Sequence, residues 1–216
     1  ITSVEPQKKN PKRFNIFLDG EFAFGADEDL VVSRRLVVGK LLDTSDVEKL
    51  LFEAEVGKLM ERMYRLWNIR ARSEKEIRDY LKNLSFKRKI KNQDQISYLI
   101  VNTTIDTLKK KGLINDQDFA RSWVENRRKK RGPRILKQEL FQKGIDKEII
   151  EEVVSEMAIG YNGQAVAESL LEKKLRVWKN LPKLEFKKKA YEFLLRRGFE
   201  YDVIHDVIEN LMKKRY

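Results

Sequence analysis

The spacing of hydrophobic residues changes near residue 45. Before it, the runs 13–18 and 21–24 place apolar side chains at alternate positions, the period of a half-buried β-strand. Asp19 and Gly20 separate the runs, and this pair favours a tight turn because both turn positions need a positive φ. We predict a β-hairpin here, a further strand at 1–4 that ends at Pro6, and a short helix at 27–35. A lone hairpin is marginal in water, so this one should pack on a helix.

From residue 44 onward, apolar residues recur every three or four positions, which is the period of an amphipathic helix. Ser45 and Ser73 are each followed three residues later by glutamate, the pattern of a capping box at a helix start. Gly112, Gly144 and Gly198 follow periodic stretches, as glycines do where helices end. These signals predict nine helices, at 46–71, 73–84, 95–111, 116–130, 133–143, 147–158, 162–178, 182–197 and 200–213.

The predicted helices fall into three groups of three that resemble one another. Segment 140–145, LFQKGI, is similar to segment 194–199, LLRRGF, and each group contains one tryptophan. In the first group, Ser85 replaces the glycine, and a longer basic connection is expected at 87–95. A unit of about 50 residues buries little surface alone, so neighbouring groups should pack together. We predict a mainly α fold, an elongated, curved array of three tandem three-helix repeats with a small N-terminal β-hairpin extension, divided into 1–45, 46–113, 114–158 and 159–216.

Trp67, Trp123 and Trp178 occupy equivalent places in the three groups. We expect them to anchor the cores, and Phe119, four residues before Trp123, would share its helix face. The alternative is that they stack on nucleic-acid bases. Trp178, near a helix end with Lys179 beside it, is the one that we expect to be exposed.

Charge follows the same repeat. The chain has 46 Lys and Arg against 34 Asp and Glu, a net charge of +12, and residues 1–45 are neutral overall. Segments 62–91, 121–143 and 172–197 carry net charges of +8, +7 and +7, whereas 92–120, 144–171 and 198–216 carry −1, −5 and −1. If equivalent helices stack along one edge, the basic segments form a continuous stripe that attracts polyanions. The alternative is that each segment is only a solvated helix face.

The densest cationic run is Arg127–Arg131, followed by Gly132 and Pro133. A few cations suit the negative end of a helix dipole, but five adjacent ones exceed that need. We interpret the run as a binding element, with a frayed, solvated helix end as the alternative. The candidate nucleic-acid-binding or partner-binding residues are Arg72, Lys87, Arg88, Lys89, Arg121, Arg127, Arg128, Lys129, Lys130, Arg131, Arg134, Lys137, Lys173, Lys174, Lys187, Lys188, Arg196 and Arg197.

No arrangement of catalytic residues is evident in the sequence. There is no cysteine, and the single histidine, His205, lies among apolar residues of a predicted helix, where a packing or polar role is expected. Neither a phosphate-binding loop nor a His-Glu-x-x-His zinc site is present. We predict no enzyme activity, cofactor or metal. The alternative is a nuclease that holds its metal by Asp and Glu alone.

No apolar run is long enough to cross a bilayer, so we expect a cytoplasmic monomer without membrane contact.

Segments 113–127, LINDQDFARSWVENR, and 132–145, GPRILKQELFQKGI, resemble the core motif of the RecX family. Segment 72–77, RSEKEI, resembles the element that opens the second helix of the family's first repeat, and 19–24, DGEFAF, the N-terminal extension of its longer members. Ser85 and the long 87–95 connection depart from the family pattern. The resemblance implies a regulator of the RecA recombinase that binds along the groove of the RecA–DNA filament and inhibits ATP hydrolysis, filament extension and strand exchange.

Under this hypothesis the partners are the RecA filament and single- and double-stranded DNA. Binding to phosphate by a charged stripe has no sequence preference and weakens with salt. The alternative is a non-specific DNA-binding helical module that acts independently of RecA.

Overall fold

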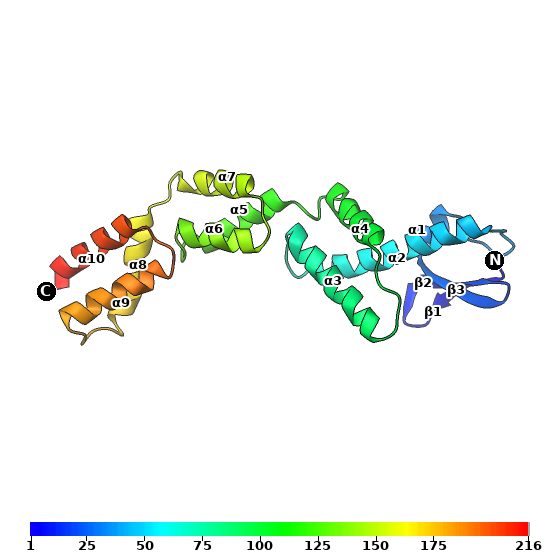
Figure 1. Ribbon diagram of the computed structural model, residues 1–216, viewed down its shortest axis with the longest axis horizontal. Coiled ribbons are helices and arrows are strands. Elements are labelled where there is room, and N and C mark those ends of the chain that lie inside the picture. The colour runs from blue at the N-terminus through cyan, green and yellow to red at the C-terminus, as the bar shows by residue number, and fades with distance from the viewer. Residues whose placement is uncertain (216) are drawn as a thin grey trace. The chain divides into compact units, whose positions relative to one another are not determined.

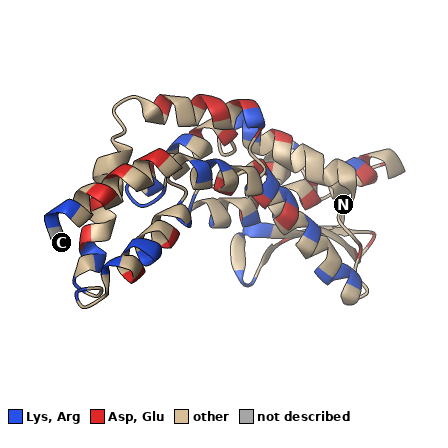
Figure 2. Ribbon diagram, turned by 60° about the vertical axis from the view of Figure 1, so that its left-hand side comes forward, with Lys and Arg blue, Asp and Glu red and all other residues tan. Residues whose placement is uncertain are grey.

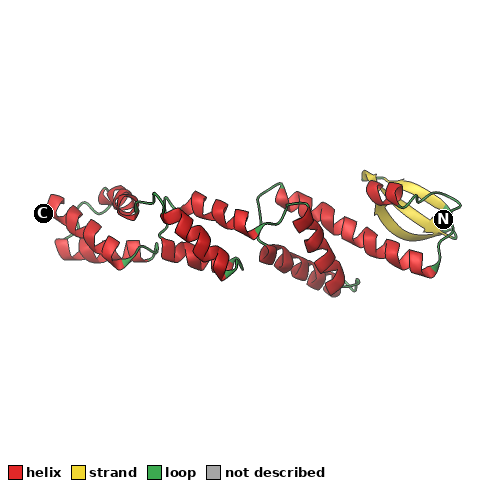
Figure 3. Cartoon of the chain, turned by 90° about the horizontal axis from the view of Figure 1, so that it is seen from above, coloured by secondary structure: helices red, strands yellow, loops and turns green. Residues whose placement is uncertain are grey.

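The structure is a computed structural model that describes residues 1–215, with the side chains of residues 1–214. The chain divides into two compact units, Ile1–Ile114 and Asn115–Tyr216. Strands occur only near the N-terminus, and the part of the chain described beyond residue 27 is helical between its loops (Figure 1, Figure 3). This confirms a mainly helical fold after a small sheet. The curvature of the array and the limits of the repeats remain predictions.

The N-terminal sheet is antiparallel, with strands β1 (Ser3–Gln7), β2 (Asn10–Leu18) and β3 (Glu21–Asp27) in that order. Asp19 and Gly20 have φ values of 51° and 86°, which confirms the predicted turn. The prediction that Pro6 ends the first strand is wrong, since Pro6 lies within β1 and pairs with Phe14 of β2. Its missing N–H is tolerated because β1 is an edge strand.

One long helix, α2 (Thr44–Trp67), packs against the sheet and continues into the first helical group. Helix α1 (Glu28–Ser33) precedes it. The core under the sheet contains Ile16, Phe24, Ala26, Leu30, Leu36, Leu50 and Ala54, which confirms that the hairpin packs on a helix. The predicted capping role of Ser45 is wrong: Asp43 is the N-cap of α2, and its side chain accepts a hydrogen bond from the Asp46 backbone N–H. An aspartate fills this position because its carboxylate also suits the positive end of the helix dipole.

Helices α3 (Glu74–Ile90) and α4 (Tyr98–Lys110) complete the first unit. Helix α3 is longer than predicted, so residues 87–90 belong to the helix and the connection is shorter. Ser85 lies inside α3, and its hydroxyl accepts a hydrogen bond from the Ile96 backbone N–H at 3.0 Å. A helix that continues past residue 85 needs no glycine there, because the backbone never enters the left-handed region.

The second unit contains two groups of three helices. The first is α5 (Asp116–Arg127), α6 (Pro133–Gln142) and α7 (Lys147–Ala158), and the second is α8 (Gly163–Leu175), α9 (Lys183–Leu195) and α10 (Tyr201–Arg215). Each group has its own core. Gly144 and Gly198 have φ values of 75° and 81°, which confirms the predicted glycine helix ends.

The tryptophans divide differently from the prediction. Trp178 packs against Phe186 and Phe193, with ring centroids 6.1 and 5.6 Å away, so the expectation that it is the exposed one is wrong. Trp67, at the end of α2, is 45% exposed. The expectation that Trp67 anchors the core of the first group is therefore wrong, and Leu59 and Met63 of α2 contribute to that core instead. No helix in the described residues is long and apolar enough to span a membrane.

Candidate nucleic-acid and partner interface

Trp123 is held in place by contacts with residues of the basic segment 121–143. Its indole Nε1 donates a hydrogen bond to Glu139 at 2.9 Å, Phe119 stacks on it at a centroid distance of 5.6 Å, and the Arg127 guanidinium carbon lies 4.0 Å from its ring centroid. These contacts confirm the packing interpretation of Trp123. They also occupy ring surface that a stacked base would need.

Glu139 forms ion pairs with the basic residues at and just after the end of α5. Besides Trp123, it pairs with Arg127 at 3.4 Å and with Arg131 at 3.7 Å. Two guanidinium groups and one indole N–H therefore converge on one carboxylate of α6, which ties the end of α5 to α6. In the sequence, the only indication of this convergence is an acidic residue within a basic segment.

The Arg127–Arg131 run contains two kinds of residue. Its arginines are positioned by carboxylates, since Arg128 pairs with Glu125 at 3.1 Å while the other two pair with Glu139. Lys129 and Lys130 are exposed, and neither forms an ion pair with another described residue. The arginines of the run are therefore held by carboxylates, whereas its two lysines point into solvent.

One backbone hydrogen bond and one side-chain hydrogen bond bring this run against the end of α9. The Gly132 N–H donates to the Arg197 carbonyl at 2.8 Å, and the Arg134 guanidinium donates to the Leu195 carbonyl at 2.7 Å. The Tyr161 hydroxyl donates to the Arg131 carbonyl at 3.3 Å. Burial raises the pKa of Tyr161, although Arg128 opposes this, so its hydroxyl stays a donor. Two basic segments that are more than sixty residues apart in sequence therefore meet within the second unit.

We call the resulting cluster the cationic junction, and it consists of residues 127–131 with Arg134, Arg196 and Arg197. Arg197 lies 3.8 Å from the Phe193 ring centroid. Burial, followed by the charges of Arg131 and Arg196, lowers the pKa of Arg197. Mutual repulsion of this kind makes an anion at the junction favourable, because a phosphate would relieve it.

The other predicted residues of the second unit lie on helix faces outside the junction. Arg121 forms a two-pronged pair with Glu156, both bonds at 3.0 Å, and joins α5 to α7. Lys137 pairs with Glu151, and Lys187 pairs with Glu209 at 2.6 Å. The remaining ones are Lys174, whose ammonium lies 5.5 Å from the Phe193 ring, and the exposed Lys173 and Lys188.

Four predicted residues lie in the first unit. Arg88 is 14% exposed and pairs with Glu55 of α2 at 2.6 Å, so it holds α3 to α2. Lys87 and Lys89 are exposed on α3. The Arg72 side chain is half-buried, and its Nε has no hydrogen-bond partner within the described residues. The structure thus joins two of the three basic segments, and a stripe through all three remains a prediction.

Acidic residues gather away from the junction. Helix α7 carries four glutamates against one lysine, and α9 carries four lysines against two glutamates, whereas α10 has three acidic residues and three basic ones (Figure 2). The second unit therefore has helices of opposite charge, as the segment charges predicted. Among the described residues, no group of three or more His, Asp or Glu side chains is placed to hold a metal ion.

Comparison with known proteins gives a consistent result. Family models described as "Regulatory protein RecX N-terminal domain", "RecX, second three-helix domain" and "RecX, third three-helix domain" match residues 1–43, 115–154 and 162–208. The "Regulatory protein RecX" of Bacillus subtilis (strain 168) is 34% identical over 213 residues, which cover 98% of this chain and 76% of that protein. The protein of the same name from Clostridium botulinum (strain Alaska E43 / Type E3) is 30% identical and covers 98% of this chain and 96% of its own.

Solved structures agree with this assignment. A crystal structure of regulatory protein RecX matches 97% of this chain and 98% of its own, with a TM-score of 0.73 and 25% identity. The crystal structure of RecX from Lactobacillus salivarius matches 73% of this chain and 96% of its own, with a TM-score of 0.58 and 26% identity.

Proposed function

The chain belongs to the RecX family of regulatory proteins, and from this premise we propose that it regulates the RecA recombinase by binding the RecA–DNA filament. In this proposal it lies along the filament groove and limits ATP hydrolysis, filament extension and strand exchange. It acts as a monomer without catalytic activity of its own, in the cytoplasm where RecA works.

The observation that supports the proposal is the cationic junction. A backbone hydrogen bond from Gly132 and a side-chain bond from Arg134 hold the basic segments of the two helical groups together. Lysine and arginine side chains that converge on one surface bind phosphate oxygens and so neutralise a nucleic-acid backbone without reading its bases. A filament that contains both protein and DNA presents such phosphates in its groove.

Residues of the junction have different roles in this proposal. Lys129, Lys130 and Arg196 are exposed and would contact phosphate directly. Arg127 and Arg131 are held by Glu139 and would position the loop that carries the lysines. Both single- and double-stranded DNA should bind, because the junction reads charge only.

The proposal is tested by measuring RecA's DNA-dependent ATP hydrolysis and strand exchange with this protein added. We expect inhibition at substoichiometric amounts, and we expect Lys129→Glu, Lys130→Glu and Arg196→Glu combined to weaken it. A matched control reverses Lys8, Lys9 and Lys12, which are exposed in the first unit and change the net charge equally. Strand exchange that is unchanged at equimolar protein would overturn the proposal.

A non-specific DNA-binding module that acts without RecA is the second candidate, and the exposed lysines of the junction favour it. It predicts that an unrelated recombinase is inhibited to the same extent as RecA. Capture of RecA by the immobilised protein, with and without single-stranded DNA, separates the two candidates. Capture that requires DNA and extends equally to any DNA-coated protein would favour the second.

A further inference from the structure

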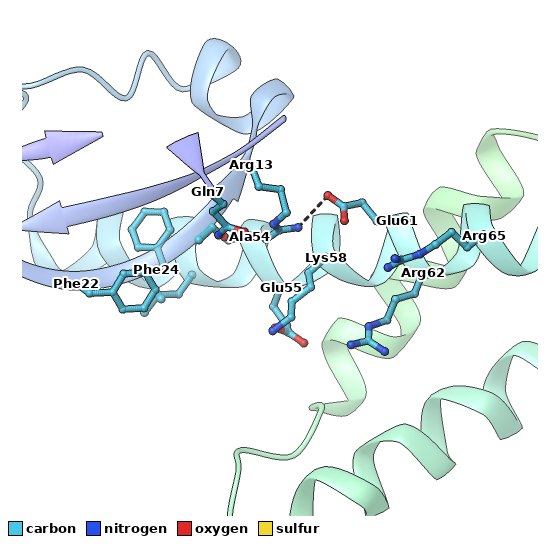
Figure 4. A pocket seen from close by; sticks show the side chains of 12 residues that line it. Gln7, Arg13, Phe22, Phe24, Ala54, Glu55, Lys58, Glu61, Arg62 and Arg65 are labelled. Atoms are coloured by element: carbon cyan, nitrogen blue, oxygen red, sulfur yellow. Dashed lines mark hydrogen bonds and ion pairs between the residues drawn. The ribbon is translucent and has the colours of Figure 1, made fainter. Parts of the chain in front are cut away.

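A cavity of about 520 Å³ opens between strand β3 and helix α2 in the first unit, and we call it the β3–α2 groove (Figure 4). Its apolar end contains Phe22, Phe24 and Leu51. Phe22 is 59% exposed and Leu51 is 43% exposed, so the groove presents apolar surface to solvent. Of these three residues, only Phe24 also belongs to the core under the sheet.

The other end of the groove is cationic. Lys58, Arg62 and Arg65 follow one another at intervals of four and three residues along α2 and therefore share one face of the helix. Neither Arg62 nor Arg65 forms an ion pair with another residue that the structure describes. Lys58 has only a weak contact with Glu55 at 4.0 Å and is about half exposed.

The two carboxylates of the groove are already matched by cations from outside this helix face. Glu61 pairs with Arg13 of β2 at 2.9 Å, and Glu55 pairs with Arg88 of α3 at 2.6 Å. The charges of Lys58, Arg62 and Arg65 are consequently in excess. A ligand that neutralises them must bring its own negative charge.

The groove also reaches the unpaired edge of the sheet. Strand β3 pairs with β2 on one side only, and the lining includes Phe24 from the core face of the strand and Gly25 from the opposite face. The edge at β1 contains Pro6, which weakens strand addition, whereas β3 contains neither proline nor lysine. An edge without these protective residues is open to pairing with an extended chain, apart from the Gly25 carbonyl, which accepts a hydrogen bond from the Arg13 guanidinium at 3.1 Å.

We propose that the β3–α2 groove binds an extended, acidic peptide segment of a partner protein, which pairs with β3 and places an apolar side chain against Phe22 and Leu51. Side chains on one face of an extended chain are about 7 Å apart, whereas the cations of α2 are separated by rises of about 6 Å and about 4.5 Å along the helix. The long, flexible lysine and arginine side chains can bridge the difference. Acidic residues at alternate positions would thus face the cations of α2 in turn. This mode combines main-chain hydrogen bonds with side-chain specificity.

A single-stranded nucleic acid would satisfy the cations but not the strand edge, because it has no peptide N–H and C=O groups to pair with β3. For this reason the observations favour a peptide. The proposal does not depend on the proposed action on RecA, and it concerns a surface separate from the cationic junction.

The test uses the full chain and a short fluorescent peptide whose alternate residues are one valine followed by three glutamates, with threonine between them, so that the apolar and acidic side chains share one face. Binding is followed by fluorescence anisotropy. We expect Arg62→Glu and Arg65→Glu combined to weaken binding by about tenfold or more. The matched control, Lys147→Glu with Lys213→Glu, changes the net charge equally at two exposed positions outside the junction and the groove and should leave peptide affinity unchanged. Circular dichroism verifies that both variants are folded.

Two further probes separate the elements of the proposal. A version of the peptide that is N-methylated at alternate residues cannot donate along one edge, and we expect it to bind about tenfold more weakly if strand pairing occurs. A peptide in which lysine replaces each glutamate should not bind. Equal binding of all three peptides, or no effect of the Arg62 and Arg65 changes, would overturn the proposal. A single-stranded oligonucleotide that binds through Arg62 and Arg65 while the glutamate peptide does not would overturn it too, in favour of nucleic acid.

Discussion

Gly132 and Gly198 approach so closely that a Cβ atom on Gly132 would lie 2.2 Å from the Gly198 carbonyl oxygen. Gly132 is the N-cap of α6, and Gly198 follows α9. The contact accompanies the hydrogen bond from the Gly132 N–H to the Arg197 carbonyl. The absence of a side chain at both positions is therefore what allows the two basic loops to meet.

Replacing Gly132 with alanine should destabilise the second unit. The φ of Gly132 is −82°, which alanine adopts without strain, so the effect is steric. We expect a loss of about 1–3 kcal/mol in the free energy of unfolding, the usual cost of forcing a close contact apart, measured by urea denaturation. Gly163→Ala is the control, because the nearest atom to its Cβ would be on the Tyr161 ring at 3.3 Å. Equal stability of the two variants would contradict the expectation.

Replacing Glu139 with glutamine should loosen the junction. The substitution keeps the side-chain size but removes the charge that Arg127 and Arg131 share. Since the carboxylate is only partly exposed, we expect a loss of about 1 kcal/mol or more in unfolding free energy. Thermal and urea unfolding both report it. Gln138→Ala, on the same helix but exposed, is the control and should leave stability unchanged. An unfolding free energy of Glu139→Gln equal to that of the parent would contradict the expectation.

Replacing Lys129 and Lys130 with glutamine should change how DNA affinity depends on salt. If each lysine contacts a phosphate, the slope of log K against log salt concentration becomes shallower by about 2 for duplex DNA. Both side chains are exposed and unpaired within the described chain, so the unfolding free energy should not change. The same substitutions at Lys8 and Lys9 serve as the comparison. An unchanged slope would mean that the lysines form only a solvated helix end.

The Glu74 carboxylate should make stability depend on acidity. Burial alone would raise the pKa of Glu74, but hydrogen bonds from Lys109 and Arg78 outweigh it and lower the pKa below its ordinary value. A lowered pKa stabilises the fold above the unfolded-state value of about 4.3, and this contribution is lost as the pH falls through the folded-state pKa. Unfolding measured from neutral pH into the acid range should therefore show a smaller loss in Glu74→Gln than in the parent. Parallel pH profiles would rule this contribution out.

Local features of the fold could be predicted from the sequence, because they depend on neighbours in the chain. The Asp19-Gly20 turn and the ends of helices at Gly144 and Gly198 are set by backbone conformations that few residues adopt. The helix from Glu74 to Ile90 is longer than the sequence predicts, since no glycine or proline marks its end.

The cationic junction could be predicted only in part. Its arginines and lysines were identified by charge density, but their meeting depends on a backbone hydrogen bond between Gly132 and Arg197, which has no signature in side-chain pattern. The β3–α2 groove was not predicted at all. Lys58, Arg62 and Arg65 look like an ordinary solvated helix face until the pairing of Glu55 and Glu61 with Arg88 and Arg13 is known.

Helix α2 has a thermodynamic consequence for the whole first unit. It supplies Leu50 and Ala54 to the core under the sheet, and Leu59 and Met63 to the core with α3 and α4. Neither core can melt alone without breaking the helix between residues 54 and 59, where the i→i−4 bonds are continuous. The sheet and the first helical group therefore form one cooperative folding unit, and heat should unfold them in a single calorimetric transition.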